Sequence, residues 1–205
     1  MTVYKAERIA DLLEQGLSAA TTDPFGIVPT PDLTALRESG AGSVDLRLGT
    51  WFAALRQARR SHLAVRDGAA ESELSRTSYV RFGESYFLHP GGFVLAVSLE
   101  WIRLPSTLCA YVIGKSSWGR RGLIIATAVG VHPGFKGCLT LELTNVGELT
   151  MELKPGMAIG QLFVHRVEDS SSERVDRSRF IGLRRPTVGG VETDAIAEKL
   201  AGGGG

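Results

Sequence analysis

The chain has 205 residues, of which 43% are hydrophobic and 22% are charged, with a formal net charge of +1. This length and composition allow one globular domain with a sizeable core, and the near-zero charge gives no bulk electrostatic reason to expect a nucleic-acid or membrane partner. No apolar run approaches the roughly 18 residues that a membrane span needs, and the first ten residues lack the apolar core of a signal peptide.

The first predicted element is a helix over residues 5–15. Three apolar side chains recur there at helical spacing, and Gly16 follows as a stop signal. After a loop with several prolines, the β part begins with SVDLRLG at residues 43–49. In that strand an apolar face alternates with Asp45 and Arg47, which we interpret as a structural ion pair.

Residues 54–77 are rich in Arg, Ala, Ser and Glu, and we expect them to form a surface insertion. From Tyr79 onward, short apolar segments are separated by turn signals such as Pro90-Gly91-Gly92 and Pro155-Gly156. Frequent turns between short strands favour an all-β barrel or sandwich over alternating strands and helices.

The two cysteines, Cys109 and Cys138, both lie in predicted strands. They have no metal-site spacing, and we interpret them as small buried side chains in a reducing compartment rather than as a disulfide. The sequence therefore predicts a cytoplasmic protein.

The polar turn Lys115–Arg120 combines two hydroxyls, at Ser116 and Ser117, with several cations and two flanking glycines. Hydroxyls, main-chain amides and cations together could hold an anion. The alternative is an ordinary polar turn with a surface ion pair, in which Arg120 could also pair with Glu142.

Glu142 lies in the middle of the alternating segment 138–144. Three leucines share one face of this predicted strand, and Glu142 shares the other face with Cys138 and two threonines. A carboxylate held at the edge of a core could serve as a general acid or base. The alternative is a solvent-facing glutamate, since most charged strand residues are exposed.

Six motifs follow one another along the chain: SVDLRLG (43–49), FLHPGGFVLAVSLEWIRLP (87–105), GKSSWGRRGL (114–123), HPGFKG (132–137), GCLTLELTNVG (137–147) and LKPGMAIGQL (153–162). In this order they resemble the consecutive motifs of the dCTP deaminase branch of the dUTPase-like superfamily. The resemblance covers roughly residues 43 to 187.

This resemblance implies a mainly β fold, a distorted jelly-roll-like barrel of the dUTPase-like type with a short N-terminal helix. It implies a single domain over residues 1–190, and we expect the glycine-ended stretch 191–205 to be a flexible tail. It also implies a homotrimer with active sites between subunits, which the sequence pattern alone does not predict.

The resemblance implies a role for each residue of a catalytic group. Glu142 would be the general base, and Ser116 would position the attacking water. The main-chain carbonyl of Ala128 would help to hold this water, and Arg120 would lie near both the carboxylate and the substrate phosphates. The implied substrate-binding residues are Lys115, Ser117, Val131, His132, Gln161 and Arg179.

The implied reaction is hydrolysis of the amino group at C4 of a cytosine nucleotide, dCTP or a close relative, with release of ammonia. The chain lacks the H-x-E and P-C-x-x-C signature of zinc deaminases, so we expect no protein-bound metal. Mg²⁺ would be carried by the substrate phosphates, as is common for this ion.

The chain departs from the family pattern at several sugar and phosphate contacts. His132 stands where the family has an aspartate that recognises the sugar 3′-hydroxyl, and Gly130 replaces a frequent arginine. In the segment 178–187, Arg179 and Leu183 replace a lysine and a glutamine. Losing a buried polar contact of this kind costs about 1–3 kcal/mol, so several losses could change the substrate.

Two alternatives therefore stay open. One is a dUTPase-type enzyme or a bifunctional enzyme that couples deamination to diphosphate release. The other is a catalytically weak nucleotide-binding regulator.

Overall fold

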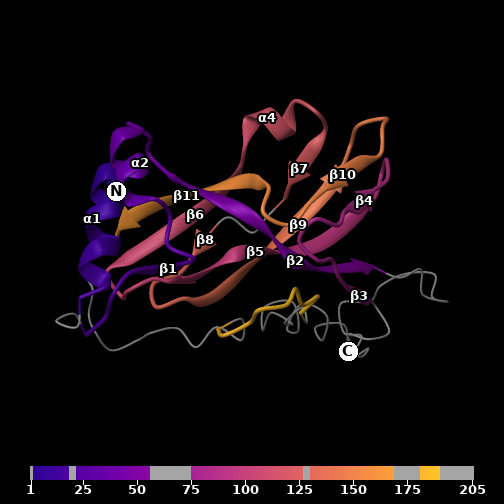
Figure 1. Ribbon diagram of the computed structural model, residues 1–205. Helices are drawn as coiled ribbons and strands as arrows, with labels where there is room; N and C mark the ends of the chain where they lie inside the picture. The colour runs from indigo at the N-terminus through magenta and orange to yellow at the C-terminus, as the bar shows by residue number, and fades with distance from the viewer. Residues whose placement is uncertain (1, 19–21, 56–74, 127–129, 169–180, 190–205) are drawn as a thin grey trace, which may run out of the picture.

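Segments with alternating apolar side chains form most of the structure. The computed structural model describes residues 2–18, 22–55, 75–126, 130–168 and 181–189 (Figure 1). Within these residues, nine strands form one curled antiparallel sheet in the order β7-β9-β5-β2-β11-β6-β8, with β1 added to β5 and β3 to β2. Strands β4 and β10 form a separate pair. The mainly β fold with a short N-terminal helix is confirmed.

The helices are α1 (Ala6–Gly16), α2 (Leu33–Glu38) and α4 (Ser116–Gly119). The strands are β1 (Gly26–Val28), β2 (Val44–Leu55), β3 (Ser75–Tyr79), β4 (Tyr86–Leu88), β5 (Phe93–Arg103), β6 (Leu108–Gly114), β7 (Leu123–Ile125), β8 (Gly130–Val131), β9 (Lys136–Asn145), β10 (Met151–Leu153) and β11 (Ala158–Arg166). No helix among the described residues is long and apolar enough to cross a membrane.

Helix α1 is the predicted N-terminal helix. Its apolar side chains Ile9 and Leu13 are 0% and 2% exposed and belong to the core. A Cβ atom at residue 16 would lie 2.1 Å from the main-chain oxygen of Phe25. Only glycine allows this close approach, so packing against Phe25 requires glycine at the end of the helix.

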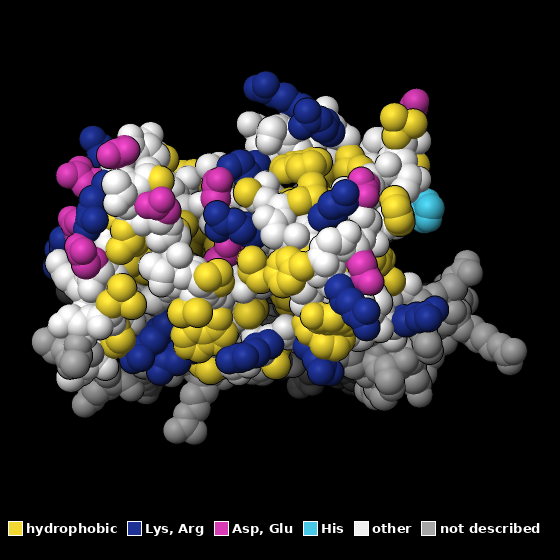
Figure 2. Space-filling model, viewed as in Figure 1, with side chains coloured by type: hydrophobic (Ala, Val, Ile, Leu, Met, Phe, Trp, Pro, Cys, Tyr) yellow, Lys and Arg dark blue, Asp and Glu magenta, His cyan; other side chains and the backbone are white. Residues whose placement is uncertain are grey.

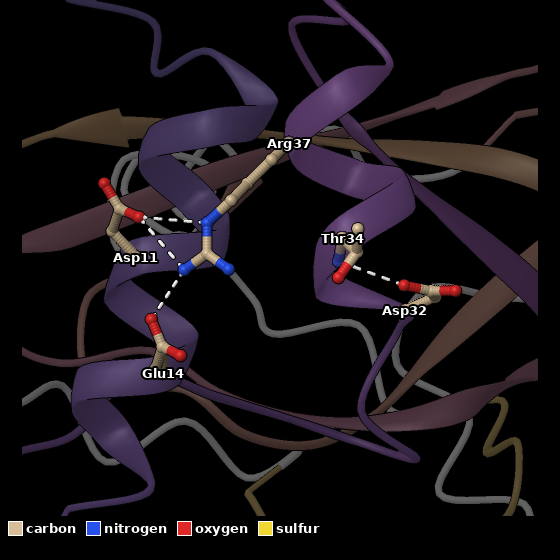
Figure 3. Close-up of polar contacts among 5 residues, drawn as sticks. All are labelled: Asp11, Glu14, Asp32, Thr34 and Arg37. Carbon is tan, nitrogen blue, oxygen red and sulfur yellow. Dashed lines mark hydrogen bonds and ion pairs between the residues drawn. The ribbon is translucent and has the colours of Figure 1, made fainter.

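Helix α2 was not predicted, because it has only six residues and follows a proline-containing loop. The side chain of Asp32 caps it by accepting hydrogen bonds from the main-chain N–H groups of Thr34 and Ala35, both at 3.0 Å. Arg37 reaches from α2 to α1, where it donates to Asp11 at 3.2 Å and to Glu14 at 2.6 Å (Figure 3).

Strand β9 has the alternation that the sequence predicts. Leu139, Leu141 and Leu143 are 8%, 0% and 0% exposed on the core face. Glu142 lies half-buried on the opposite face, which we call the outer face of β9. At Glu142 the neighbouring strand β5 contributes Leu95 to the same face.

The regular pairing of β5 is interrupted on both sides. It shifts between Leu48 and Phe52 on β2 and between Val97 and Trp101 on β5 itself. Buried polar side chains replace the missing ladder bonds. Ser98 accepts from the main-chain N–H of Leu139 at 2.9 Å, and Glu100 accepts from the main-chain N–H of Arg47 at 2.9 Å.

The interpretation of Asp45 and Arg47 as an ion pair with each other is wrong. Asp45 pairs with Lys115 at 2.5 Å, and Arg47 pairs with Glu100 at 3.1 Å. Residues two apart on a strand are separated by about 7 Å. Partners from other segments come closer, so each charge finds its counter-ion elsewhere in the fold.

We expect lower pH to stabilise the native protein relative to the Glu100→Gln variant. Glu100 is 1% exposed, and burial raises its pKa above the ordinary 4.5, although the hydrogen bonds from Arg47 oppose the shift. A raised native pKa means that protonation favours the folded state, so this contribution grows as the pH falls through the native pKa toward 4.5. Melting temperatures of both proteins from about pH 7 to about pH 5 measure it. A difference that is flat with pH, or that favours the variant at low pH, would contradict the prediction.

Asn145, the last residue of β9, connects the turn that follows β9 to the end of β4. Its side chain is fully buried, donates to the carbonyls of Leu88 and Leu149 at 2.9 and 2.8 Å, and accepts from the N–H of Gly147 at 2.9 Å. No apolar side chain could replace these three bonds.

Asn145→Ala is therefore expected to cost about 2–4 kcal/mol of unfolding free energy, because buried main-chain groups lose their partners. For a chain of this size the melting temperature should fall by about 5–15 °C. Thermal unfolding followed by circular dichroism checks this, with the exposed Val146→Ala as a control. Equal melting temperatures for the two variants would show that water replaces the lost bonds.

The predicted insertion at 54–77 joins two paired strands. Leu55 at the end of β2 lies opposite Ser75 at the start of β3. Residues 56–74 and 190–205 lie outside the described residues, so the surface insertion and the flexible tail at 191–205 stay predictions.

Candidate active site

Glu142 presents its carboxylate on the outer face of β9. Its main-chain oxygen accepts a hydrogen bond from Ala126 at 2.9 Å, where the chain leaves β7. Its carboxylate makes no hydrogen bond or ion pair with another residue in the described part of the chain. A half-buried carboxylate whose oxygens are free can accept a proton from a bound water.

The polar turn that carries Ser116, Ser117 and Arg120 forms the one-turn helix α4. The indole N–H of Trp118 donates to the carbonyl of Ala158 at 3.0 Å and anchors the turn to the start of β11. This anchoring leaves the two serines and Arg120 exposed. The hydroxyls and the guanidinium of the turn are therefore available to a ligand.

Lys115 and Gln161 are brought together across three strands. The ammonium of Lys115 pairs with Asp45 on β2, and Gln161 on β11 lies directly opposite both Asp45 and Ile113 of β6. Figure 2 shows basic and acidic side chains next to one another over β6 and β11. We call Lys115, Asp45 and Gln161 the polar cluster; its ammonium and amide donors, with the hydroxyl of Ser117, could bind phosphate oxygens.

Val131 and His132 lie on another part of the sheet. Val131 is 5% exposed and pairs with Ala110 of β6, whereas His132 is exposed at the turn that follows. The carbonyl of His132 accepts from the N–H of Phe135 at 3.2 Å, which closes the turn.

The suggested pair between Arg120 and Glu142 is not formed among the described residues of this chain. In Figure 1, α4 projects from one side of the curled sheet, while residues 181–189 run along the opposite side. Ala128 and Arg179, two further predicted site residues, lie outside the described residues.

Residues 181–189, which we call the C-terminal strap, contact the strand of Glu142. Gly182 donates to the carbonyl of Lys136 at 2.6 Å, and the carbonyl of Leu183 accepts from Cys138 at 2.9 Å. The strap thus follows the edge of β9 away from β5. These bonds tie the turn at residues 181–182 to the start of the strand that carries the candidate base.

The strap then reaches the outer face. The guanidinium of Arg185 lies 4.1 Å from the ring centroid of Trp51. Trp51 lies on the same face of β2 as Ala53. Ala53 is paired with Leu95 of β5, and Leu95 is paired with Glu142 of β9, so all of them share the outer face. Sequence reasoning missed Trp51 and Arg185, because no local pattern links a strand residue to one more than 130 positions later.

Cys138 shares the outer face of β9 but is not a nucleophile candidate. Burial raises the pKa of its thiol, the charge of Arg184 lowers it and that of Glu100 raises it. The thiol therefore stays protonated at neutral pH, as the packing role predicts. Both cysteines are free, and no group of three or more potential metal ligands occurs among the described residues.

A family model described as dCTP deaminase-like matches residues 3–167. A relative from Streptomyces griseus subsp. griseus named dCTP deaminase, dUMP-forming is 42% identical over 153 residues, which are 71% of this chain and 78% of the relative. A relative of the same name from Mycolicibacterium paratuberculosis is 41% identical over 173 residues, 82% of this chain and 87% of the relative.

A solved structure has the same fold. It is the 2′-deoxycytidine 5′-triphosphate deaminase from Agrobacterium tumefaciens, with a TM-score of 0.54 and 18% identity. The match covers 81% of this chain and 46% of that chain. The predicted fold class is thereby confirmed.

Proposed function

This chain belongs to the dCTP deaminase-like family, and from that premise we propose that it hydrolyses dCTP or a close relative to the uracil nucleotide and ammonia. The relatives are named dUMP-forming, which favours the coupled reaction, in which dCTP and two waters give dUMP, ammonia and diphosphate. The plain deaminase, which keeps all three phosphates, is the second candidate.

The observation that carries the proposal is the half-buried carboxylate of Glu142 on β9, which bonds to no other described residue. As the general base, Glu142 takes a proton from the water that attacks C4. It passes protons to N3 and to the departing amino group, so that the C4–N bond breaks and ammonia leaves. Ser116 positions this water, and the main-chain carbonyl of Ala128, close in sequence to Ala126, helps to hold it.

The substrate phosphates would lie against the polar cluster. Lys115 and Gln161 bind phosphate oxygens together with Ser117, and Arg179 joins them. Mg²⁺ would arrive with the phosphates rather than on protein ligands. No zinc site is proposed, because the chain lacks the zinc-deaminase signature. Val131 and His132 would contact the sugar and the base.

We infer that the site is completed between the copies of a homotrimer. Arg120 and Ser116 are exposed on one side of the fold, and Glu142 has no cationic partner among the described residues of its own chain. The rim of the outer face is apolar: Phe93 and Ile124, which flank Thr144 on the neighbouring strands, are 38% and 42% exposed. Such a rim suits a subunit interface. The free cysteines support a cytoplasmic location.

The test is incubation of the purified protein with dCTP, dCDP, dCMP, CTP and dUTP in the presence of Mg²⁺. Ammonia and diphosphate are measured separately. Both products from dCTP support the coupled enzyme, and ammonia alone supports the plain deaminase. Diphosphate from dUTP without ammonia from any cytosine nucleotide would replace the proposal with a dUTPase. Binding with neither product would point to a nucleotide-binding regulator.

A further inference from the structure

The ion pair of Arg47 with Glu100 has no role in the mechanism above. The Glu100 side chain is 1% exposed and the Arg47 side chain 42%. Both carboxylate oxygens are used: one accepts from the main-chain N–H of Arg47 at 2.9 Å and the other from its Nη1 at 3.1 Å. The guanidinium is thus held at one end by a buried partner while much of it faces outward.

The hydrogen bond from the main-chain N–H of Arg47 explains why Glu100 is buried at this place. It does not explain why the Arg47 guanidinium is held with 42% of its side chain exposed. The main-chain N–H of Arg47 lies just beyond Leu48, where the pairing of β2 with β5 ends, so it needs an acceptor. A guanidinium has five N–H donors. Contacts with the described residues use one of them. The remaining donors make no contact with a described residue, and 42% of the side chain is exposed to a ligand on the surface.

Arg47 lies beside the residues assigned to the phosphates. It stands two positions from Asp45 on the same face of β2, about 7 Å along the strand, and Asp45 holds Lys115. Across the sheet Arg47 is in register with Ala158, whose carbonyl anchors Trp118 of α4. Two cations in a row, each held by a carboxylate, lie beside an anchored polar turn. Donors spaced along such a row suit a chain of phosphate groups better than a single phosphate.

We propose that Arg47 is a further ligand of the substrate polyphosphate and that Glu100 is a positioning residue that fixes its guanidinium. A guanidinium fork binds phosphate oxygens in a bidentate way that lysine cannot reproduce. This inference rests on the proposed function for the identity of the ligand, a nucleoside triphosphate. Arg47 would bind the phosphates of the substrate and would take no part in the reaction at C4.

The first measurement uses inorganic tripolyphosphate, which contains no base, and isothermal titration calorimetry. Arg47→Met should weaken its binding by about 10- to 100-fold, in the range of a lost charge-assisted contact. Arg47→Lys should recover part of the affinity, and Glu100→Gln should lose several-fold because the guanidinium is less firmly held. Arg37→Met is the matched control, since Arg37 is also ion-paired and 33% exposed but lies on α2. Its affinity should equal that of the wild type.

The second measurement compares kcat and KM for dCTP. Arg47→Met and Arg47→Lys should raise KM with little change in kcat, because the contact is made equally before and during the reaction. If both substitutions lower the melting temperature while tripolyphosphate affinity and KM stay at the wild-type values, the pair is purely structural and the inference is wrong.

Failure of the inference and failure of the proposed function give different results. If the wild type releases ammonia and the Arg47 variants have the same KM, the proposed function stands and the inference about Arg47 is wrong. If the wild type releases no ammonia but binds tripolyphosphate more tightly than the Arg47 variants do, the phosphate contact stands and the deaminase function is wrong. Should Arg47→Met fail to fold, Arg47→Lys carries the same comparison.

Discussion

Replacement of Glu142 by glutamine is expected to abolish ammonia release while leaving nucleotide binding largely intact. Glutamine has nearly the shape of glutamate but cannot accept the proton of the attacking water. A positioned general base contributes about 10²- to 10⁴-fold to the rate, so turnover should fall at least by this factor. Glu142 is half-buried on β9 and makes no bond to other described side chains, so the fold should not suffer.

The measurement pairs ammonia release with calorimetric binding of dCTP to the variant. Glu148→Gln is the control, because Glu148 is an exposed glutamate in the turn that follows β9. Its turnover should equal that of the wild type. If Glu142→Gln turned over at the wild-type rate, another group would be the base, and the assignment of the site would have to be abandoned.

Two inactive variants are expected to restore each other's activity when mixed. Arg120→Ala removes the cation of the α4 turn, and Glu142→Gln removes the base. If each site takes Arg120 from one subunit and Glu142 from the next, a mixed trimer contains some sites with both native residues. With random exchange of equal amounts, about a quarter of the sites are native.

The experiment mixes the purified variants under conditions that allow subunit exchange and follows ammonia release over time. Each variant kept alone through the same treatment is the control, and size-exclusion chromatography with light scattering gives the number of subunits. Recovery toward a quarter of the wild-type rate supports sites between subunits. No recovery despite proven exchange would place Arg120 and Glu142 in one site of one chain.

The sequence by itself determined the parts of this protein that depend on local pattern. Alternation predicted β9, with its leucines inside and Glu142 outside, and helical spacing predicted α1 and its end at Gly16. These predictions hold because a strand or an amphipathic helix must turn its apolar side chains to the core wherever the core lies. The ordered motifs also indicated the family, to which the chain belongs.

Only the tertiary structure decided which charges meet. Asp45 pairs with Lys115 and Arg47 with Glu100, although the sequence had suggested that Asp45 and Arg47 pair with each other. The contact of Arg185 with Trp51 and the bonds of the C-terminal strap to β9 were equally invisible. The physical reason is that these contacts depend on strand register, on the interruptions in β5 and on the curl of the sheet. Each of these is set by packing among segments far apart in the chain, and none leaves a period in the sequence.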